Sequence, residues 1–288
     1  SGSVYYRDAD GETSSSGWSQ AIDVDTIADD ENNPDKVSRI FSTNGELIVS
    51  VRIEQRSGES DRYGVYRRVT ANNWSRVDTP EANDEVGFVY DFEYFESDYY
   101  LATFQNMFKS NGDLSSGGFD AEVNSGSGPY RDLLASDIAG NSTLFAAANN
   151  AIFGTTATPS GNGDWDNADI SGEEEVQFTA IGYYPGSNIE ENDLGAYLIA
   201  GTESTGLYEA GAGSSSNFTF YEEGADRDLL GRDGNFLTTR LSERGIQAII
   251  VDEDAGTWRS RGPHVFVGAA TAGLWRGEVD EDDDLDNE

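Results

Sequence analysis

Cysteine is absent from the 288-residue chain, so neither disulfides nor thiol chemistry can contribute to its fold or function. The only histidine is His264, which excludes a histidine-rich zinc site and disfavours a Ser-His-Asp triad. We expect it to have a structural role at the start of the strand that follows it. Lysine is limited to Lys36 and Lys109, and neither belongs to a Gly-rich phosphate-binding loop.

Long apolar runs are also missing. No stretch approaches the roughly 18 residues of a membrane-spanning helix, and the N-terminus has neither the charged start nor the apolar core of a signal peptide. The sequence therefore predicts no membrane insertion. Its start, Ser1-Gly2-Ser3, suits a chain that has lost only its initiator Met, and an intracellular origin is the simpler interpretation.

Basic residues are scarce: 18 stand against 54 acidic ones, which gives a net charge of -36. The two lysines leave sixteen Arg residues in the basic set. Molar salt screens the self-repulsion of such a charge, because the Debye length then falls to about 3 Å. The composition resembles that of halophilic archaea and their viruses. Since the Arg residues form no stripe, phosphate binding lacks a basic footprint and nucleic acid is not an expected partner.

One pattern recurs five times: an apolar strand ending in small residues, a short turn and an aliphatic-aromatic pair. The copies are 47–51 before Val65-Tyr66, 100–103 before Met107-Phe108, 144–148 before Ile152-Phe153, 197–201 before Leu207-Tyr208, and 265–269 before Leu274-Trp275. Recurrence of a hairpin about every 40 to 70 residues indicates a radial array of small sheets.

Each repeat extends to four strands. An apolar strand precedes each hairpin, at 37–43, 86–95, 130–136, 176–183 and 246–252, and a strand with an aromatic residue follows the first four, at Trp74, Phe119, Trp165 and Phe218. We therefore predict an all-β fold, a single β-propeller over residues 1–279 with five blades of four antiparallel strands. Six blades are the alternative, because segment 225–245 is either a long insertion or a partial extra blade. Residues 280–288 form an acidic tail.

The fifth repeat has no outer strand of its own, whereas the N-terminus supplies two spare strands around Val4–Arg7 and Trp18–Ile22. A ring of sheets must pair its two ends, because an open edge leaves N–H and C=O groups unpaired. We therefore predict that Trp18–Ile22 closes the ring by joining the sheet of Val265–Ala269 and Leu274–Val279.

This strand order, with a Gly-aromatic step and an outer-strand Trp, resembles the β-propellers of the Asp-box and sortilin type over nearly the whole chain. That family carries Ser-x-Asp-x-Gly-x-x-Trp in the turn before the outer strand. Here the nearest match is Asp8-Ala9-Asp10-Gly11, with Trp18 several residues late. Sialidases of the same fold are less similar, because their Phe-Arg-Ile-Pro motif is replaced by Ser38-Arg39-Ile40-Phe41.

Asp8, Asp10 and Glu12 resemble the start of a calcium-binding loop. The twelfth position of such a loop requires a bidentate Glu, and this chain has Ser19 there. A solvated turn is therefore the main interpretation, with binding of Ca²⁺ or a monovalent cation as the alternative. The sequence predicts no cofactor.

Aromatic and acidic residues are most densely interleaved between Phe88 and Tyr100. Strict alternation would place Phe88, Tyr90, Phe92 and Tyr94 on one strand face, with Glu93 and Phe95 on the other. A core between two sheets is the first interpretation, and a binding platform is the alternative.

The predicted function is that of a non-enzymatic structural or interaction module of a halophile, most concretely a capsid-decorating or spike protein on a virion surface. Its partners would be other structural proteins of the assembly and surface glycan. One alternative is a glycoside hydrolase of propeller fold, which would use two acids that the sequence alone does not single out. The other is an intracellular scaffold in the cytoplasm of a haloarchaeon.

Contact residues for the interaction role are predicted in segment 225–245, because Arg and apolar anchors in a polar loop suit an interface core. They are Arg227, Leu229, Leu230, Arg232 and Phe236. The alternative for Leu229 and Leu230 is that they pack the segment onto its own blade.

We expect folding to require molar KCl or NaCl. Dilution to about 0.1 M salt lengthens the Debye length to roughly 10 Å and leaves the repulsion among 36 net negative charges unscreened. The melting temperature, followed by circular dichroism between 0.1 and 3 M salt, should fall steadily on dilution. An unchanged melting temperature would contradict the halophilic assignment.

Overall fold

A computed structural model gives the structure of the chain. It describes residues 4–6, 19–22, 34–53, 62–70, 73–81, 85–115, 117–123, 128–138, 141–149, 151–159, 164–170, 176–184, 187–189, 192–194, 197–211, 219–220, 229–231, 241, 244–252 and 264–279. The backbone divides into two compact units, Ser1–Asn124 and Ser125–Glu288. Every named element is a strand, as the sequence predicts. Within the described ranges, no helix has the length and apolar character that crossing a membrane requires.

The first unit contains three antiparallel sheets. A two-stranded sheet pairs β1 (Val4–Tyr6) with β2 (Ser19–Ile22). The sheet that we call sheet 1 has the order β3 (Pro34–Thr43), β4 (Glu46–Ile53), β5 (Arg62–Thr70), β6 (Asn73–Arg76), with β7 (Glu85–Val86) also paired to β5. Sheet 2 has the order β8 (Val89–Phe95), β9 (Asp98–Thr103), β10 (Met107–Ser110), β11 (Phe119–Glu122).

The second unit contains three larger sheets and one small hairpin. Sheet 3 runs β12 (Tyr130–Ile138), β13 (Asn141–Ala148), β14 (Ala151–Thr155), β15 (Asp166–Ile170), β21 (Thr219–Phe220). Sheet 4 runs β16 (Phe178–Tyr184), β19 (Tyr197–Thr202), β20 (Leu207–Gly211). Sheet 5 runs β23 (Ile246–Asp252), β24 (His264–Ala269), β25 (Gly273–Val279), β22 (Leu229–Gly231). The small hairpin pairs β17 (Ser187–Ile189) with β18 (Asn192–Leu194).

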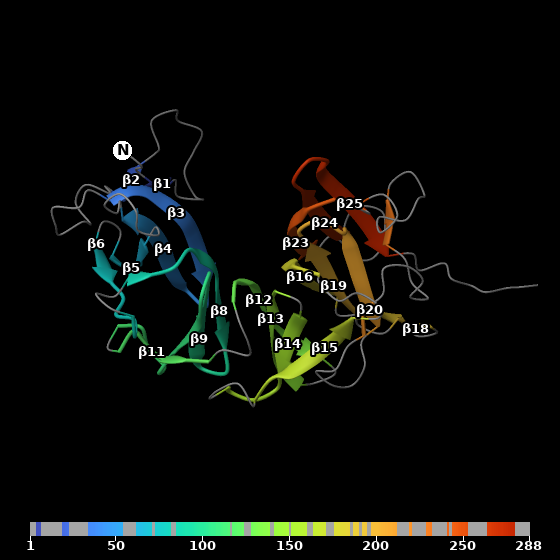
Figure 1. Ribbon diagram of the computed structural model, residues 1–288, viewed down its shortest axis with the longest axis horizontal. Helices are drawn as coiled ribbons and strands as arrows, with labels where there is room; N and C mark the ends of the chain where they lie inside the picture. The colour runs from blue at the N-terminus through green and yellow to red at the C-terminus, as the bar shows by residue number, and fades with distance from the viewer. Residues whose placement is uncertain are drawn as a thin grey trace, which may run out of the picture. The chain divides into compact units, whose positions relative to one another are not determined.

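The first strand of each of the five sheets lies at a sheet edge, and neighbouring first strands lie side by side. In the first unit β3 lies beside β8, and in the second unit β12 lies beside β16 and β16 beside β23 (Figure 1). Successive sheets therefore follow one another with the same strand at the same edge, as the repeated hairpin predicts.

Two predicted strand pairings are wrong. The strand expected after Phe218 to complete sheet 4 is β21, and it pairs in parallel with β15 of sheet 3. The N-terminal strand around Trp18–Ile22 does not join sheet 5, because β22 pairs with β25 there and β2 pairs with β1. The edge groups of Gly277–Val279 are thus already matched to Leu229–Gly231 from segment 225–245. The fifth repeat lacks an outer strand directly after its hairpin, but Leu229–Gly231 of segment 225–245 supplies that strand.

Two tight turns fix the register of the first hairpins in sheets 1 and 2. Asn44 and Gly45, between β3 and β4, have φ of 46° and 78°. Glu96 and Ser97, between β8 and β9, have φ of 49° and 76°. Positive φ at both central residues defines the turn whose twist matches that of antiparallel strands. Asn-Gly tolerates this backbone well, whereas Glu-Ser adopts it at a conformational cost.

A β-bulge recurs at one place in the first strand of all five sheets. One residue of each first strand is skipped at this place in the pairing with the second strand, and sheet 1 has a further shift between Pro34 and Lys36. The flanking pairs are Val37/Arg39, Val89/Asp91, Tyr130/Asp132, Phe178/Ala180 and Ile246/Ala248, and the skipped residues are Ser38, Tyr90, Arg131, Thr179 and Gln247. The shared register lets residues of different sheets be compared position by position.

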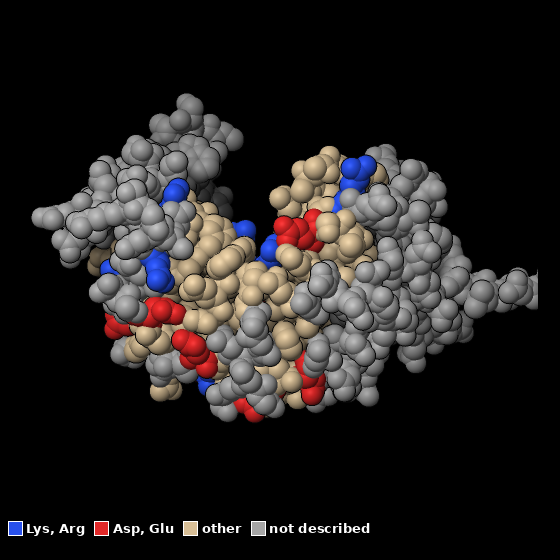
Figure 2. All heavy atoms as spheres, in the orientation of Figure 1, with Lys and Arg blue, Asp and Glu red and all other residues tan. Residues whose placement is uncertain are grey.

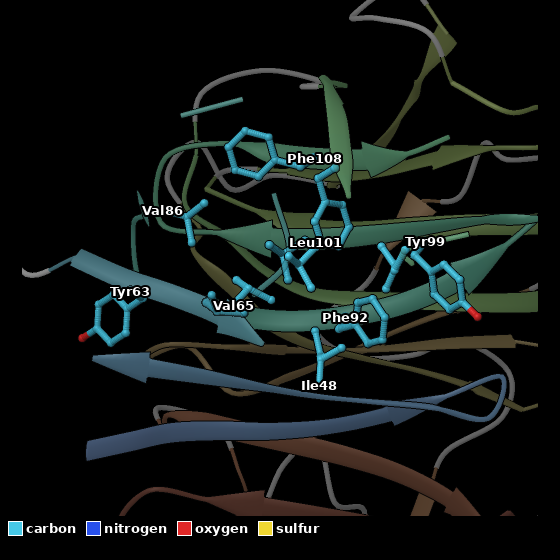
Figure 3. Packing of buried hydrophobic residues seen from close by; sticks show 12 residues of the cluster. Ile48, Tyr63, Val65, Val86, Phe92, Tyr99, Leu101 and Phe108 are labelled. Carbon is cyan, nitrogen blue, oxygen red and sulfur yellow. The ribbon is translucent and has the colours of Figure 1, made fainter. Parts of the chain in front are cut away.

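Apolar side chains of neighbouring sheets form the cores of the two units. In the first unit, Ile48 and Val65 of sheet 1 meet Phe92 and Leu101 of sheet 2 (Figure 3). In the second unit, one cluster joins sheets 3 and 4 around Phe145 and Phe178, and another joins sheets 4 and 5 around Ile199 and Ile246. Face-to-face packing of sheets thus supplies the main apolar contact within each unit.

Glycine allows sheets 4 and 5 to approach closely. A Cβ added to Gly201 would overlap the side chain of Ile246, and one added to Gly182 would overlap that of Ile249. Gly268 holds the position in sheet 5 that Gly201 holds in sheet 4, each opposite the residue after the bulge. A Cβ at Gly268 would meet nothing nearer than Ala248 at 3.8 Å.

We expect Gly201→Ala to destabilise the protein by about 1–3 kcal/mol, the usual range for overpacking a tight core. The added methyl group must displace Ile246 or separate the two sheets. Gly268→Ala is the matched control, because it makes the same change at the same repeat position with room to spare, and its stability should stay within about 0.5 kcal/mol of wild type. Chemical denaturation at fixed salt measures both, and equal effects would contradict the packing.

Candidate functional site

Polar contacts at the bulges connect neighbouring sheets. Arg131 donates from Nη2 to Gln177 Oε1 at 3.2 Å and to Glu203 Oε2 at 3.0 Å, which joins sheet 3 to sheet 4. Thr179 donates from Oγ1 to the carbonyl of Ile246 at 2.6 Å, which joins sheet 4 to sheet 5. Skipped residues of the bulges thus hold the first strands of successive sheets together.

An aspartate after the bulge makes a contact of the same kind. Asp132 accepts the backbone N–H of Ile181 at Oδ2, over 2.7 Å. Asp91 occupies the same position in sheet 2, where it follows the bulge at Tyr90. The repeat therefore places Asp91 where the corresponding aspartate of sheet 3 has a structural role.

The bulge of sheet 2 also carries an aromatic cluster. Arg39 of sheet 1 donates from Nη1 to the carbonyl of Tyr90 at 3.0 Å, and its guanidinium carbon lies 5.5 Å from the ring centroid of Phe88 and 6.0 Å from that of Tyr90. The Phe88 ring meets Tyr90 edge-on at 4.8 Å and Tyr63 at 5.3 Å. These distances are typical of cation–π and edge-to-face contacts.

The aromatic alternation predicted along β8 is correct for Phe88, Phe92 and Tyr94, which all pack against the core of the first unit. Phe92 stacks on Tyr99 with ring centroids 5.3 Å apart. Tyr90 is the exception, because the bulge skips it in the register between β8 and β9. The bulge interrupts the two-residue period on which the prediction relied.

Glu93 is the residue of β8 that departs most clearly from the repeat. It stands four residues beyond the first bulge-flanking residue, opposite Tyr100. The other four sheets place apolar residues or glycine at this position, namely Phe41, Leu134, Gly182 and Ile250. The carboxylate here is half-buried, and it accepts a hydrogen bond from Thr43 of sheet 1.

The surroundings of Glu93 favour the protonated acid. Burial raises the pKa of its carboxyl, and the nearby Asp91 raises it further. Hydrogen bonds to the Oε1 atom from the Tyr94 N–H and the Thr43 hydroxyl, both at 2.8 Å, act in the opposite direction. The pKa remains above its ordinary value because desolvation is the largest of these effects.

Asp91 and Glu93 lie on the same face of β8, because residues two apart on a strand point the same way and no bulge separates them. Burial favours the neutral form of the Glu93 carboxyl, and the charge of the nearby Asp91 acts in the same direction. Such a pair can donate a proton from one member and accept one at the other. Perturbed carboxyl groups of this kind are typical of functional sites.

The metal site and most of the contact residues predicted from the sequence lie outside the described residues. These are Asp8, Asp10, Glu12, Arg227, Arg232 and Phe236. Leu229 and Leu230 lie on β22, opposite Val279 and Glu278 of β25. His264 begins β24 and pairs with Asp252 and Glu278 in the backbone register. The predicted interaction role therefore stays a prediction.

Within the described part of the chain, no three His, Cys, Asp or Glu side chains gather closely enough to hold a metal ion. Over the described part of the face in Figure 2, acidic and basic side chains are interspersed among other residues, without a patch of one sign.

No protein-family model matches the chain, and no curated protein matches it. Solved structures do match, at low identity. Mala s 1, the major allergen of Malassezia sympodialis, is 10% identical, with 82% of this chain and 74% of that chain covered and a TM-score of 0.46. The extracellular domain of a protein assigned to a hybrid two-component system of B. thetaiotaomicron is 13% identical, with 95% and 37% covered and a TM-score of 0.47. A glycosyl hydrolase from Bacteroides ovatus is 11% identical, with 83% and 82% covered and a TM-score of 0.36. At these TM-scores the likenesses carry no argument about function.

We expect Glu93→Gln to stabilise the protein increasingly as pH rises. The pKa of Glu93 in the folded protein is above the ordinary Glu value of about 4.3. The contribution of neutral Glu93 to stability is therefore complete below about pH 4.3, and it is lost as the pH rises and Glu93 ionises in the folded protein. Gln has no charge to desolvate and keeps the Oε1 acceptor. Denaturation midpoints should coincide near pH 4 and separate in favour of the variant near pH 8. A difference that is independent of pH would contradict the raised pKa.

Proposed function

We propose that the chain is a glycoside hydrolase in which Glu93 donates the proton and Asp91 is the second carboxylate. The observation that carries this proposal is the raised pKa of Glu93 at a position where the other four sheets have apolar residues or glycine. Glycoside hydrolysis needs two carboxyl groups on either side of one bond, and the donor must keep its proton near neutral pH. The raised pKa of Glu93 supports its role as the donor, and Asp91 on the same strand face supplies a second carboxyl group.

Within this proposal we assign hydrolysis with inversion, which the distance between the two carboxyl groups in a substrate complex would test. Residues two apart on a strand have Cα atoms roughly 6.6 Å apart, since a strand rises about 3.3 Å per residue. Inverting enzymes separate their carboxyl groups by about 6.5–9.5 Å to admit a water molecule, whereas retaining enzymes separate them by about 5–5.5 Å.

The reaction then proceeds in one displacement. The protonated Glu93 gives its proton to the glycosidic oxygen as the bond from that oxygen to the anomeric carbon breaks. A water molecule attacks the anomeric carbon from the opposite face and gives its proton to Asp91. The products are two sugars, and proton exchange with solvent restores both carboxyl groups.

We also propose that sheets 1 to 5 are the five blades of one β-propeller. The shared bulge, the shared register and the common position of each first strand support this architecture. In a propeller the first strand of each blade lines the central channel, which would expose Asp91 and Glu93 of β8 to substrate. Because Asp91 and Glu93 are half-buried, part of each side chain remains open to solvent.

The test is a screen of α- and β-linked oligosaccharides for released reducing sugar at 3 M KCl. Glu93→Gln and Asp91→Asn should each lower kcat/KM by a factor of about 10² to 10⁴, the usual contribution of a positioned acid or base. Wild-type activity should fall as pH rises through the raised pKa of Glu93, because the donor loses its proton.

The matched control is Glu122→Gln, which removes an exposed carboxylate from β11 of the same sheet and should leave kcat/KM unchanged. Proton NMR of the first product formed should show an inverted anomeric configuration. Absence of hydrolysis across the screen, or full activity in Glu93→Gln, would refute the proposed function.

A further inference from the structure

Sheet 2 has aromatic residues at three positions where sheet 4 has polar ones. Phe88, Tyr90 and Phe104 of sheet 2 correspond to Gln177, Thr179 and Glu203 of sheet 4. The backbone confirms this correspondence, because the N–H of Phe104 donates to the carbonyl of Phe88 as that of Glu203 donates to the carbonyl of Gln177, at 2.9 and 2.8 Å.

The three polar residues of sheet 4 show that polar side chains at these positions can join neighbouring sheets. Gln177 and Glu203 bind Arg131 of the preceding sheet, and Thr179 binds the following sheet. In sheet 2 the preceding sheet also contributes an arginine, Arg39, but it meets the rings of Phe88 and Tyr90. Joining two sheets therefore does not require aromatic residues here.

Phe104 takes no part in the contact with Arg39, and 52% of its surface is exposed. It is held next to Phe88 by the backbone hydrogen bond, and a Cβ at Gly87 would lie 3.4 Å from its own Cβ. Its backbone is tied to Phe88, whose ring contacts Tyr90 and Arg39, so an exposed apolar residue adjoins this cluster, and such a grouping is typical of a ligand surface. The apolar C–H face of a sugar ring suits such a surface, and Arg39 carries donors for sugar hydroxyl groups.

We propose that Arg39, Phe88, Tyr90 and Phe104 form a glycan-binding subsite. This inference rests on the proposed function and deepens it, because Tyr90 directly precedes Asp91 on β8 and Phe88 directly precedes that strand. Tyr90 and Glu93 are about 10 Å apart along the strand at roughly 3.3 Å per residue. A substrate that reaches both must span several sugar units, so the class of ligand is an oligosaccharide and not a disaccharide.

Binding is measured by calorimetry on the Glu93→Gln protein, which removes turnover, at 3 M KCl. The probes are hexaoses of glucose, mannose, xylose and N-acetylglucosamine, with the matching disaccharides. Phe104→Ala in this background should raise the Kd of the bound hexaose about tenfold, which corresponds to 1.4 kcal/mol, and should leave disaccharide binding unchanged. Val69→Ala is the control, because Val69 of β5 is another exposed apolar residue of the first unit, with 47% of its surface exposed.

The outcomes separate the subsite from the proposed function. Hydrolysis that depends on Glu93, together with a hexaose Kd that Phe104→Ala leaves unchanged, overturns the subsite alone. Hexaose binding that depends on Phe104 without any hydrolysis by wild type supports the subsite and overturns the catalytic role. Failure of every hexaose to bind the Glu93→Gln protein overturns the subsite, and the absence of hydrolysis by wild type in addition overturns both.

Discussion

Close face-to-face packing of successive sheets is the constraint on which the rest of this structure depends. Each unit is held together by apolar faces that meet between neighbouring sheets, and the closest approach occurs where Gly182 and Gly201 admit Ile249 and Ile246. Sheets pack at this distance only when one surface supplies small residues and the other supplies branched ones. Glycine at these two positions is therefore what lets sheets 4 and 5 approach closely.

The recurrent bulge follows from the same packing. It skips one residue of each first strand in the register with the second strand, and the side chain of that residue can contact the neighbouring sheet. Thr179 and Arg131 show the result, since each bonds to the next sheet from a skipped position. The bulge thus places polar or aromatic side chains at one end of every first strand. Residues there can form a binding site without disturbing the core.

Glu93 departs from this pattern, and we propose it as the proton donor. Burial of its carboxyl raises the pKa, which means that the ionised form is unfavourable in the folded protein. The same position holds apolar residues or glycine in the other sheets, and those would pack at no such cost. Retention of an acid there, with Asp91 two residues away and Arg39 and three aromatic rings at the same end of β8, is the strongest sign that this strand does more than support the fold.

The sequence by itself determined the all-β character, the five hairpins and the approximate limits of their strands, because apolar periodicity and small residues are local features that packing preserves. It also singled out the aromatic and acidic run from Phe88 to Tyr100. Three features depend on the tertiary structure. Strand β22 and not the N-terminus completes sheet 5, because pairing between distant segments depends on which edge is free in space. The bulge at Tyr90 interrupts the alternation along β8, because it is selected by the neighbouring sheet and not by the strand's own residues. Glu93 was indistinguishable in the sequence from dozens of solvated acids, since only burial beside Thr43 and Asp91 changes the proton affinity of a carboxyl group.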